Sequence, residues 1–220
     1  MKNFTSKLKS AYSNFYSRGM WLSMSGESKS GLGSTLIYSE SYSENLIKLI
    51  KKYNIKKIFD TSCGDWFWMK NIKEHFEHYI GNDICKELII ENKKKYESDN
   101  IKFSNNDMLS QMQLYNNLEF DLIICRHTFE HLPTEYNLRC ISEMKRISKF
   151  ALITSANLDY SLNKESELNF SAQFIPPYNS VNLDLSPYKE ILLDPIEKIW
   201  DSIVGTQFNK GTYGYLYTFV

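Results

Sequence analysis

The sequence predicts a doubly wound α/β fold, with a mostly parallel sheet and helices on both faces, in a single domain of 220 residues. Short runs of Ile, Leu, Phe and Val alternate with longer amphipathic segments, and this alternation is typical of a parallel sheet covered on both sides. Hydrophobic residues make up 42% of the chain, which is enough for a substantial core. The chain contains no internal repeat and no interdomain linker.

The predicted elements follow one another in a regular order. Residues 1–40 are expected to form a helix and then a loop rich in Ser and Gly. Apolar residues at helical spacing predict a second helix at about 42–53. Beyond it, strands are expected at 58–60, 78–83, 101–107, 120–126 and 149–155, with helices at 66–76, 86–96 and 138–147.

The pattern changes after residue 155. Residues 157–188 contain Pro176 and Pro177 and show little periodicity, so a long loop is predicted, and long loops inside a domain are usually functional or disordered. The apolar runs at 189–193 and 213–219 are interpreted as two closing strands.

Composition narrows the class of protein. Lys and Arg total 26 and Asp and Glu total 26, so the chain has no electrostatic attraction to nucleic acid or an anionic membrane. No apolar run approaches the roughly 20 residues of a membrane span, and the first residues lack the apolar core of a signal peptide. The four Cys form no Cys-x-x-Cys pair, which favours reduced thiols. We therefore expect a cytoplasmic protein whose partner is a small molecule.

The segment DTSCGDW, residues 60–66, indicates what kind of site the fold carries. Asp60 ends the first strand, and a turn of small residues leads through Gly64 toward a helix N-terminus, where free N–H groups favour an anionic group. The G-x-G-x-x-G fingerprint and the P-loop pattern are both absent. About twenty residues further on, Asp83 ends the second strand, where a ribose diol would be bound.

These features resemble the class I S-adenosylmethionine-dependent methyltransferases, whose first motif is a strand followed by D-x-G-x-G-x-G, commonly D-x-G-C-G. The chain matches this motif at Asp60, Cys63 and Gly64, and it departs at Ser62 and Trp66, where the wider family has Gly. The resemblance spans essentially the whole chain. It implies one domain over the full length, with strand order 3-2-1-4-5-7-6 and an antiparallel last strand.

A small bacterial subgroup of these enzymes is similar in more detail. Several of its members are associated with surface polysaccharide modification. The subgroup tolerates a CGD-[FW]-x-WM form of the motif, as at residues 63–69 here. It also carries a W…SG-x-GS-T segment before the first helix, which this chain matches at Trp21 and residues 30–35.

The resemblance implies S-adenosyl-L-methionine as the cofactor. The turn after the first strand would surround its methionine part, Asp83 would bind the ribose, and the Asp107 region would meet the adenine. The implied cofactor residues are Asp60, Ser62, Cys63, Gly64, Asp65, Asp83, Ile84, Asp107 and Met108. From the residues alone, an Asp at a strand end is often only a helix cap, so that alternative stays open.

The segment CRHTFEHLP holds the candidate catalytic residues. His127, Glu130 and His131 spell the zinc-protease pattern H-x-x-E-H, but Pro133 limits the helix that pattern needs, so no metal is expected. His131 matches the family's E-H-L element and could take a proton from an acceptor hydroxyl near neutral pH. His127 is the weaker candidate, and Arg126 could orient an anionic acceptor. A purely structural His131 is the open alternative.

Two irregular segments are expected to cover the carboxyl end of the sheet. They are a lid within residues 1–40 and a substrate loop at 156–190, and they supply aromatic and polar groups for an acceptor. The expected acceptor contacts are Trp21, Thr35, Tyr178 and Tyr188.

The resemblance implies methyl transfer, with oxygen of a small polar acceptor as the expected target. The acceptor would be a sugar or phosphate-type precursor of capsular or surface polysaccharide, by analogy alone. A nicotinamide-dependent oxidoreductase and a non-catalytic methyltransferase-like partner protein are the alternatives. The missing glycines argue against the first, and the intact cofactor residues argue against the second.

Overall fold

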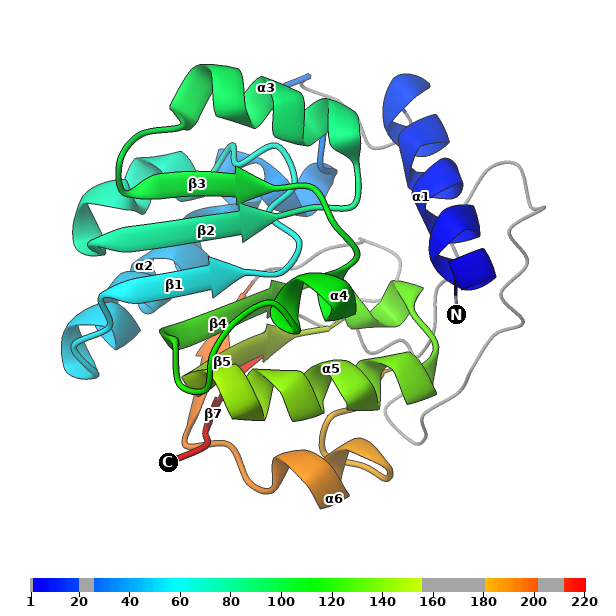
Figure 1. Cartoon of the computed structure of the whole chain (residues 1–220). Helices are drawn as coiled ribbons and strands as arrows, with labels where there is room; N and C mark the ends of the chain where they lie inside the picture. The colour runs from blue at the N-terminus through cyan, green and yellow to red at the C-terminus, as the bar shows by residue number, and fades with distance from the viewer. Residues whose placement is uncertain (1, 20–25, 156–180, 202–211) are drawn as a thin grey trace.

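The computed structural model describes residues 2–19, 26–155, 181–201 and 212–220 (Figure 1). The strands are β1 (Lys57–Asp60), β2 (His78–Asn82), β3 (Ile101–Ser104), β4 (Phe120–Arg126), β5 (Ser148–Thr154), β6 (Glu197–Trp200) and β7 (Tyr213–Thr218). The α-helices are α1 (Lys2–Ser17), α2 (Leu36–Lys52), α3 (Lys86–Tyr96), α4 (Met108–Met112), α5 (Thr134–Ile147) and α6 (Tyr188–Leu192). Three 3₁₀ segments complete the set, namely η1 (Leu32–Ser34), η2 (Met69–His75) and η3 (Phe129–His131).

The seven strands form one sheet in the order β3-β2-β1-β4-β5-β7-β6. Strands β1 to β5 pair in parallel, whereas β7 runs antiparallel to both of its neighbours. The predicted fold class and strand order, with an antiparallel last strand, are therefore confirmed.

Alternate residues of the central strands build two separate cores. Ile58 and Leu122 pack with α2 and η2 on one face, while Phe59 and Ile123 pack with α4 and α5 on the other. All four side chains are fully buried. Because both faces need apolar residues, these strands read as nearly continuous apolar runs in the sequence.

One predicted element is wrong in type. The strand predicted at 189–193 is instead α6, which buries Tyr188 and Leu192, and the closing strand is β6. A five-residue apolar run cannot distinguish strand from helix by periodicity alone. The helix predicted at 66–76 is present as the shorter 3₁₀ helix η2.

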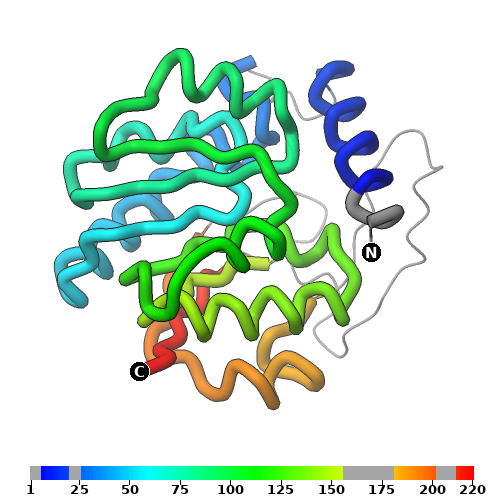
Figure 2. Tube along the Cα trace, viewed as in Figure 1, coloured from blue at the N-terminus to red at the C-terminus, as the bar shows by residue number. Residues whose placement is uncertain are grey.

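The carboxyl ends of six strands meet at one edge of the sheet. Strands β1 to β5 are parallel, and β6 runs in the same direction because it is antiparallel to β7, which is antiparallel to β5. Helix α1 lies beside this edge, in front of the arrowheads of β1, β2 and β3 (Figures 1 and 2). No helix within the described ranges is both long enough and apolar enough to cross a membrane.

The turn after β1 explains one departure from the family motif. Trp66 adopts the left-handed conformation, with φ of 57°, at a position where the wider family has Gly. That conformation costs an L-residue about 1–2 kcal/mol. The Trp66 ring offsets this cost because it is buried among Tyr79, Tyr96 and Phe103.

We expect Trp66→Gly to be more stable than Trp66→Ala by about 1 kcal/mol, because only the backbone strain differs between the two. Both variants should be less stable than the parent by about 3–5 kcal/mol because they lose the buried ring. Urea unfolding measures the three free energies of unfolding.

Trp68 is the matched control, since it is also buried but has a right-handed backbone with φ of −85°. There the order should reverse, with Ala more stable than Gly by about 0.5–1 kcal/mol. The same order at both positions would contradict the account of Trp66.

Candidate active site

A cavity of about 400 Å³ opens at the carboxyl edge of the sheet. Its walls come from α1, the 30–34 segment, the ends of β1, β2 and β4, the start of α4, and the η3 turn. The cavity brings together most of the sequence-predicted site residues, namely Asp60, Ser62, Cys63, Gly64, Asp83, Ile84, Asp107, Met108, Arg126, His127 and His131.

Asp60 lies at the bottom of the turn that follows β1. Its buried carboxylate accepts hydrogen bonds from the Tyr79 hydroxyl at 2.9 Å and from the Ser62 amide at 3.2 Å. Burial raises the pKa of Asp60 to about 7, because the charged form loses its hydration. Asp60 therefore changes charge close to neutral pH.

Gly64 brings the turn after β1 close to its neighbours. Its φ is 55°, and a Cβ atom there would lie 2.3 Å from the Ser30 hydroxyl oxygen, so no side chain fits. Its amide donates to the Asp83 carboxylate at 3.0 Å. The residues that follow β1 and β2 are thereby joined at the cavity wall.

Asp83 is a second buried carboxylate on this wall. Its other oxygen accepts the Cys85 amide at 2.8 Å. Burial raises the pKa of Asp83 to about 6, while the hydrogen bonds from the Cys85 and Gly64 amides lower it. Each oxygen carries a second lone pair, so the carboxylate can still accept hydroxyl donors from the cavity.

Asp107 caps α4 and also lines the cavity. Its carboxylate accepts the Ser110 amide at 3.0 Å and the Tyr136 hydroxyl at 2.7 Å. The helix-cap reading is thus correct for Asp107, and it does not remove the residue from the site. Met108 is the first residue of α4 and lines the same part of the cavity.

Asp65 has a different environment from the other predicted cofactor residues. It does not line the cavity, and its carboxylate accepts the Lys29 amide at 2.7 Å and the Ser28 hydroxyl at 3.0 Å. In return, the Asp65 amide donates to the Ser30 hydroxyl at 2.8 Å. Asp65 therefore anchors the segment beginning at Ser28, which packs against the β1 turn and supplies cavity-lining residues 30–34.

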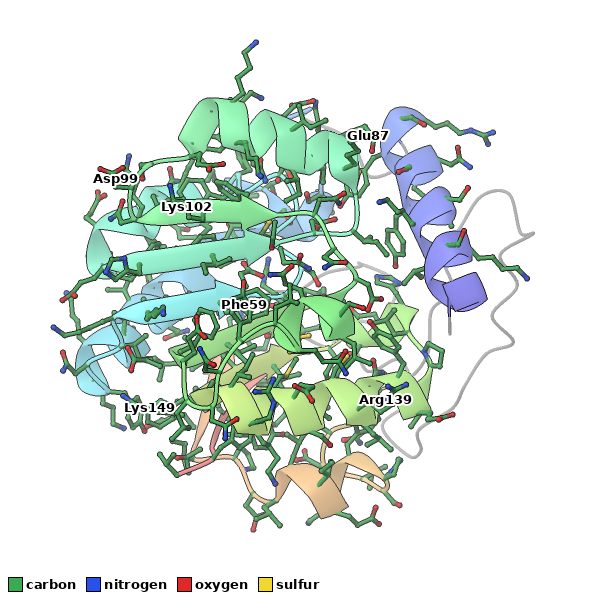
Figure 3. All side chains as sticks on the ribbon, viewed as in Figure 1. Phe59, Glu87, Asp99, Lys102, Arg139 and Lys149 are labelled. Carbon is green, nitrogen blue, oxygen red and sulfur yellow. The ribbon has the colours of Figure 1, made fainter. Side chains whose placement is uncertain are left out.

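Helix α1 supplies wall residues that sequence reasoning missed. Leu8, Tyr12 and Tyr16 line the cavity, and Ser13 donates to Glu87 of α3 at 3.2 Å. Figure 3 labels Glu87 at the end of α3 that faces α1. The helical pattern of α1 is visible in the sequence, but its position over the strand ends is set by long-range contacts.

Four charged groups form a buried network that joins the end of β4, the η3 turn and the residue after β6. The Arg126 guanidinium donates to Asp201 at 2.6 and 3.0 Å and to the Gly33 carbonyl at 3.1 Å. The two ring nitrogens of His127 lie 3.0 Å from Glu130 and 3.1 Å from Asp201. The side chains of Glu130 and Asp201 are fully buried.

The network sets the protonation state of its members. Burial opposes charge on His127, but the hydrogen bonds to Asp201 and Glu130 outweigh it and raise the His127 pKa to about 9. Burial likewise opposes charge on Asp201, yet the adjacent Arg126 guanidinium lowers the Asp201 pKa to about 2. Two cations and two anions therefore face one another, and the network is neutral overall.

Arg126 is also held by aromatic rings. Its guanidinium carbon lies 4.7 Å from the centre of the Tyr42 ring and 5.4 Å from that of Trp68. Cation–π contacts of this kind favour the charged guanidinium. The side chain is thereby fixed on several sides.

His131 reaches the cavity from the end of η3. It is buried, and its ring lies edge-on to Tyr12 with centroids 6.2 Å apart. It lines the cavity together with Leu132 and Leu8, so an acceptor could meet a ring nitrogen there. Both open readings of His131, as a base and as a packing residue, are compatible with this position.

Of the predicted acceptor residues, the two that the structure describes, Thr35 and Tyr188, do not line the cavity. Trp21 and Tyr178 lie outside the described residues. Thr35 is buried beside the wall, where its hydroxyl donates to the Leu32 carbonyl at 2.8 Å. Tyr188 is buried away from the cavity, accepts from Asn137 at 3.0 Å and stacks on Phe129. Of the predicted substrate loop, Val181 and Leu183 belong to the core on the α5 face.

Sequence reasoning also missed Asp201. An acid directly after a strand is a usable signal, but the closing strand was placed at residues 189–193, so Asp201 did not stand at a strand end. In the portion of the chain that the structure describes, no group of three or more His, Cys, Asp or Glu side chains is arranged to hold a metal ion.

Part of the chain is similar to a known family. Residues 58–150 match the family model of a methyltransferase domain. No match was found among curated proteins.

Several solved structures share the fold at low sequence identity. The N-methyltransferase NodS from Bradyrhizobium japonicum is 12% identical, with a TM-score of 0.61 over 85% of this chain and 98% of its own. The 1,6-didemethyltoxoflavin-N1-methyltransferase from Burkholderia thailandensis is 10% identical, with a TM-score of 0.67 over 99% and 89% of the two chains. An S-adenosylmethionine-dependent methyltransferase from Clostridium acetobutylicum is 13% identical, with a TM-score of 0.60 over 82% and 91%. Residues 58–150 therefore match a methyltransferase domain model, and the chain has the fold of these solved methyltransferases.

Proposed function

We propose that this protein is an S-adenosylmethionine-dependent methyltransferase that acts on a small polar acceptor. The observation that carries the proposal is the arrangement of three buried carboxylates, Asp60, Asp83 and Asp107, on the wall of one cavity. They come from three neighbouring strand ends, and all three lie within the methyltransferase domain at residues 58–150.

The residues at the cavity fit this cofactor. Asp83 has acceptor capacity left for two ribose hydroxyls. Asp60, once ionised, would favour the positive charges of the methionine part. Ile84 and Met108, which line the cavity with Asp107, would offer apolar contact to the adenine. When bound, the cofactor supplies an electrophilic methyl group on a sulfonium.

The proposed reaction is methylation of a hydroxyl oxygen. His131 would accept the hydroxyl proton, and the walls formed by α1 and η3 would align the acceptor for an in-line displacement. The hydrogen bonds of Arg126 to Asp201 and Gly33 use its Nε and Nη2 atoms, so Nη1 is the atom with which it could orient an anionic acceptor. A neutral sugar hydroxyl needs no such contact.

The finer assignment is a precursor of capsular or surface polysaccharide, methylated in the cytoplasm without nucleic acid or membrane partners. It rests on the resemblance in the 30–35 segment and in the motif at 63–69. The named relatives NodS and the toxoflavin enzyme are N-methyltransferases, so amines belong in any acceptor panel.

Calorimetric titration of the purified protein with S-adenosylhomocysteine and with NADH tests the cofactor class. We expect binding of the first only. Incubation with S-adenosylmethionine and a panel of sugars, sugar phosphates and amines, read by mass spectrometry, tests the acceptor. Binding of NADH alone would favour the oxidoreductase. Cofactor binding without turnover on the whole panel would favour a non-catalytic partner.

We predict that Asp83→Asn weakens S-adenosylhomocysteine binding by about 1–3 kcal/mol, because one acceptor for a ribose hydroxyl becomes an amide donor. Calorimetry measures the change, and circular dichroism confirms that the variant folds. Asp99→Asn is the matched control, since Asp99 is exposed at the opposite edge of the sheet from α1 (Figure 3). Equal affinity in the parent and Asp83→Asn would refute the ribose assignment.

We also predict that affinity for S-adenosylmethionine rises with pH from about 6 to 8. The Asp60 pKa is about 7, and a cationic ligand binds the ionised carboxylate more tightly. The rise should approach tenfold per pH unit below the pKa and level off above it. Titrations of the parent and Asp60→Asn across this range are the measurement. An equally steep profile in Asp60→Asn would show that another group carries the dependence.

A further inference from the structure

Asp201 makes contacts unlike those of the other acids at the strand ends. It directly follows β6, its carboxylate is fully buried, and its amide donates to the Thr212 carbonyl at 3.0 Å. It receives two hydrogen bonds from Arg126 and lies 3.1 Å from a ring nitrogen of His127. Asp201 does not line the cavity, so any effect on chemistry must pass through another residue.

The residue through which it can act is His127. This residue has a left-handed backbone with φ of 52°, and its amide donates to the Thr154 carbonyl at 2.8 Å. Its second ring nitrogen reaches Glu130, and Glu130 accepts the Ser155 hydroxyl at 2.9 Å. The imidazole therefore spans the turn from residue 127 to residue 130 and ties it to the end of β5.

We propose that Asp201 is a positioning residue that fixes His127 and, through it, the turn that presents His131 to the cavity. The proposal rests on the proposed methyl transfer for its kinetic consequence, but not for its structural one. His131 follows Glu130 directly, so any rotation of the His127–Glu130 pair moves the backbone that carries the His131 ring.

The same contacts give His127 and His131 different roles. The charged groups around the His127 ring are Asp201, Glu130 and Arg126, and His131 interacts electrostatically with Glu130. Both ring nitrogens of His127 face carboxylates, so the imidazolium is the form that satisfies both. A fixed imidazolium has no lone pair with which to accept a proton. His131 is thus the histidine left to act as the base.

Nuclear magnetic resonance of the imidazole nitrogens tests the structural part without cofactor. The chain has only four His, and His78 is exposed at the far end of β2. In the parent, His127 should keep both ring protons through pH 8, and the exposed His78 serves as the reference signal. In Asp201→Asn, His127 should lose a proton at clearly lower pH, and the His131 ring signals should shift. Normal titration of His127 in the parent would overturn the proposal.

Steady-state kinetics test the functional part. Asp201→Asn should lower kcat by about 10- to 100-fold through misalignment, while KM for S-adenosylmethionine changes little. Asp194→Asn, an exposed acid ahead of β6, is the matched control and should behave as the parent. At low pH the imidazolium returns in Asp201→Asn, so its kcat deficit should narrow. A constant deficit, or an unchanged kcat, would overturn the positioning role.

If Asp201→Asn does not fold, His127→Asn is the second variant with which to test the proposal. It leaves the Arg126–Asp201 pair intact, and Asn tolerates a left-handed backbone. It should lower kcat as Asp201→Asn does, with His78→Asn as its control. An unchanged kcat in His127→Asn would overturn the proposal. Failure of the proposed function looks different: the parent itself would then not bind S-adenosylhomocysteine, while the resonance experiment would still decide the positioning claim.

Discussion

The parallel pairing of β1 to β5 is the constraint on which the site depends. It places the carboxyl ends of all these strands at one edge, where polar residues must either form hydrogen bonds with the protein or face a cavity. Asp60 and Asp83 do both, since each accepts hydrogen bonds from its surroundings and lines the cavity. The same edge receives Arg126 and, through the orientation of β6, Asp201. The chemistry of the site therefore follows from strand direction.

Much of this arrangement could be predicted from the sequence. Local signals sufficed for Asp60, Gly64 and Asp83, because each stands at a strand end or in the tight turn beside it. Strand order came from resemblance and not from local signals. The helix α6 was mistaken for a strand because a short apolar run fits both, and that error hid Asp201. The position of α1 over the cavity depends on contacts such as Ser13–Glu87, which no local pattern encodes.

Two left-handed residues follow the carboxyl ends of β1 and β4, and they are held in different ways. Trp66 occupies a position at which a family would use Gly, and a buried ring offsets its strain. His127 has the same kind of backbone, but two carboxylates hold its ring. Strained residues of this kind persist where the surroundings fix them, and they are frequent at functional sites. The departure at Trp66 from the motif that the turn resembles is thus compensated locally.

The Arg126–Asp201 pair also determines how much of the chain must be synthesised before these contacts can form. The two residues are 75 positions apart, so the guanidinium has no carboxylate at Asp201 until the ribosome has made most of the chain. Until then a buried cation would lack its counter-ion, which is a strongly unfavourable state. A nascent chain can pair β1 to β5 early, because those contacts are closer in sequence. Arg126 gains its carboxylate partner only when β6 and Asp201 are in place, so an unfinished chain could form the parallel strands while the Arg126 side chain is still unpaired with Asp201.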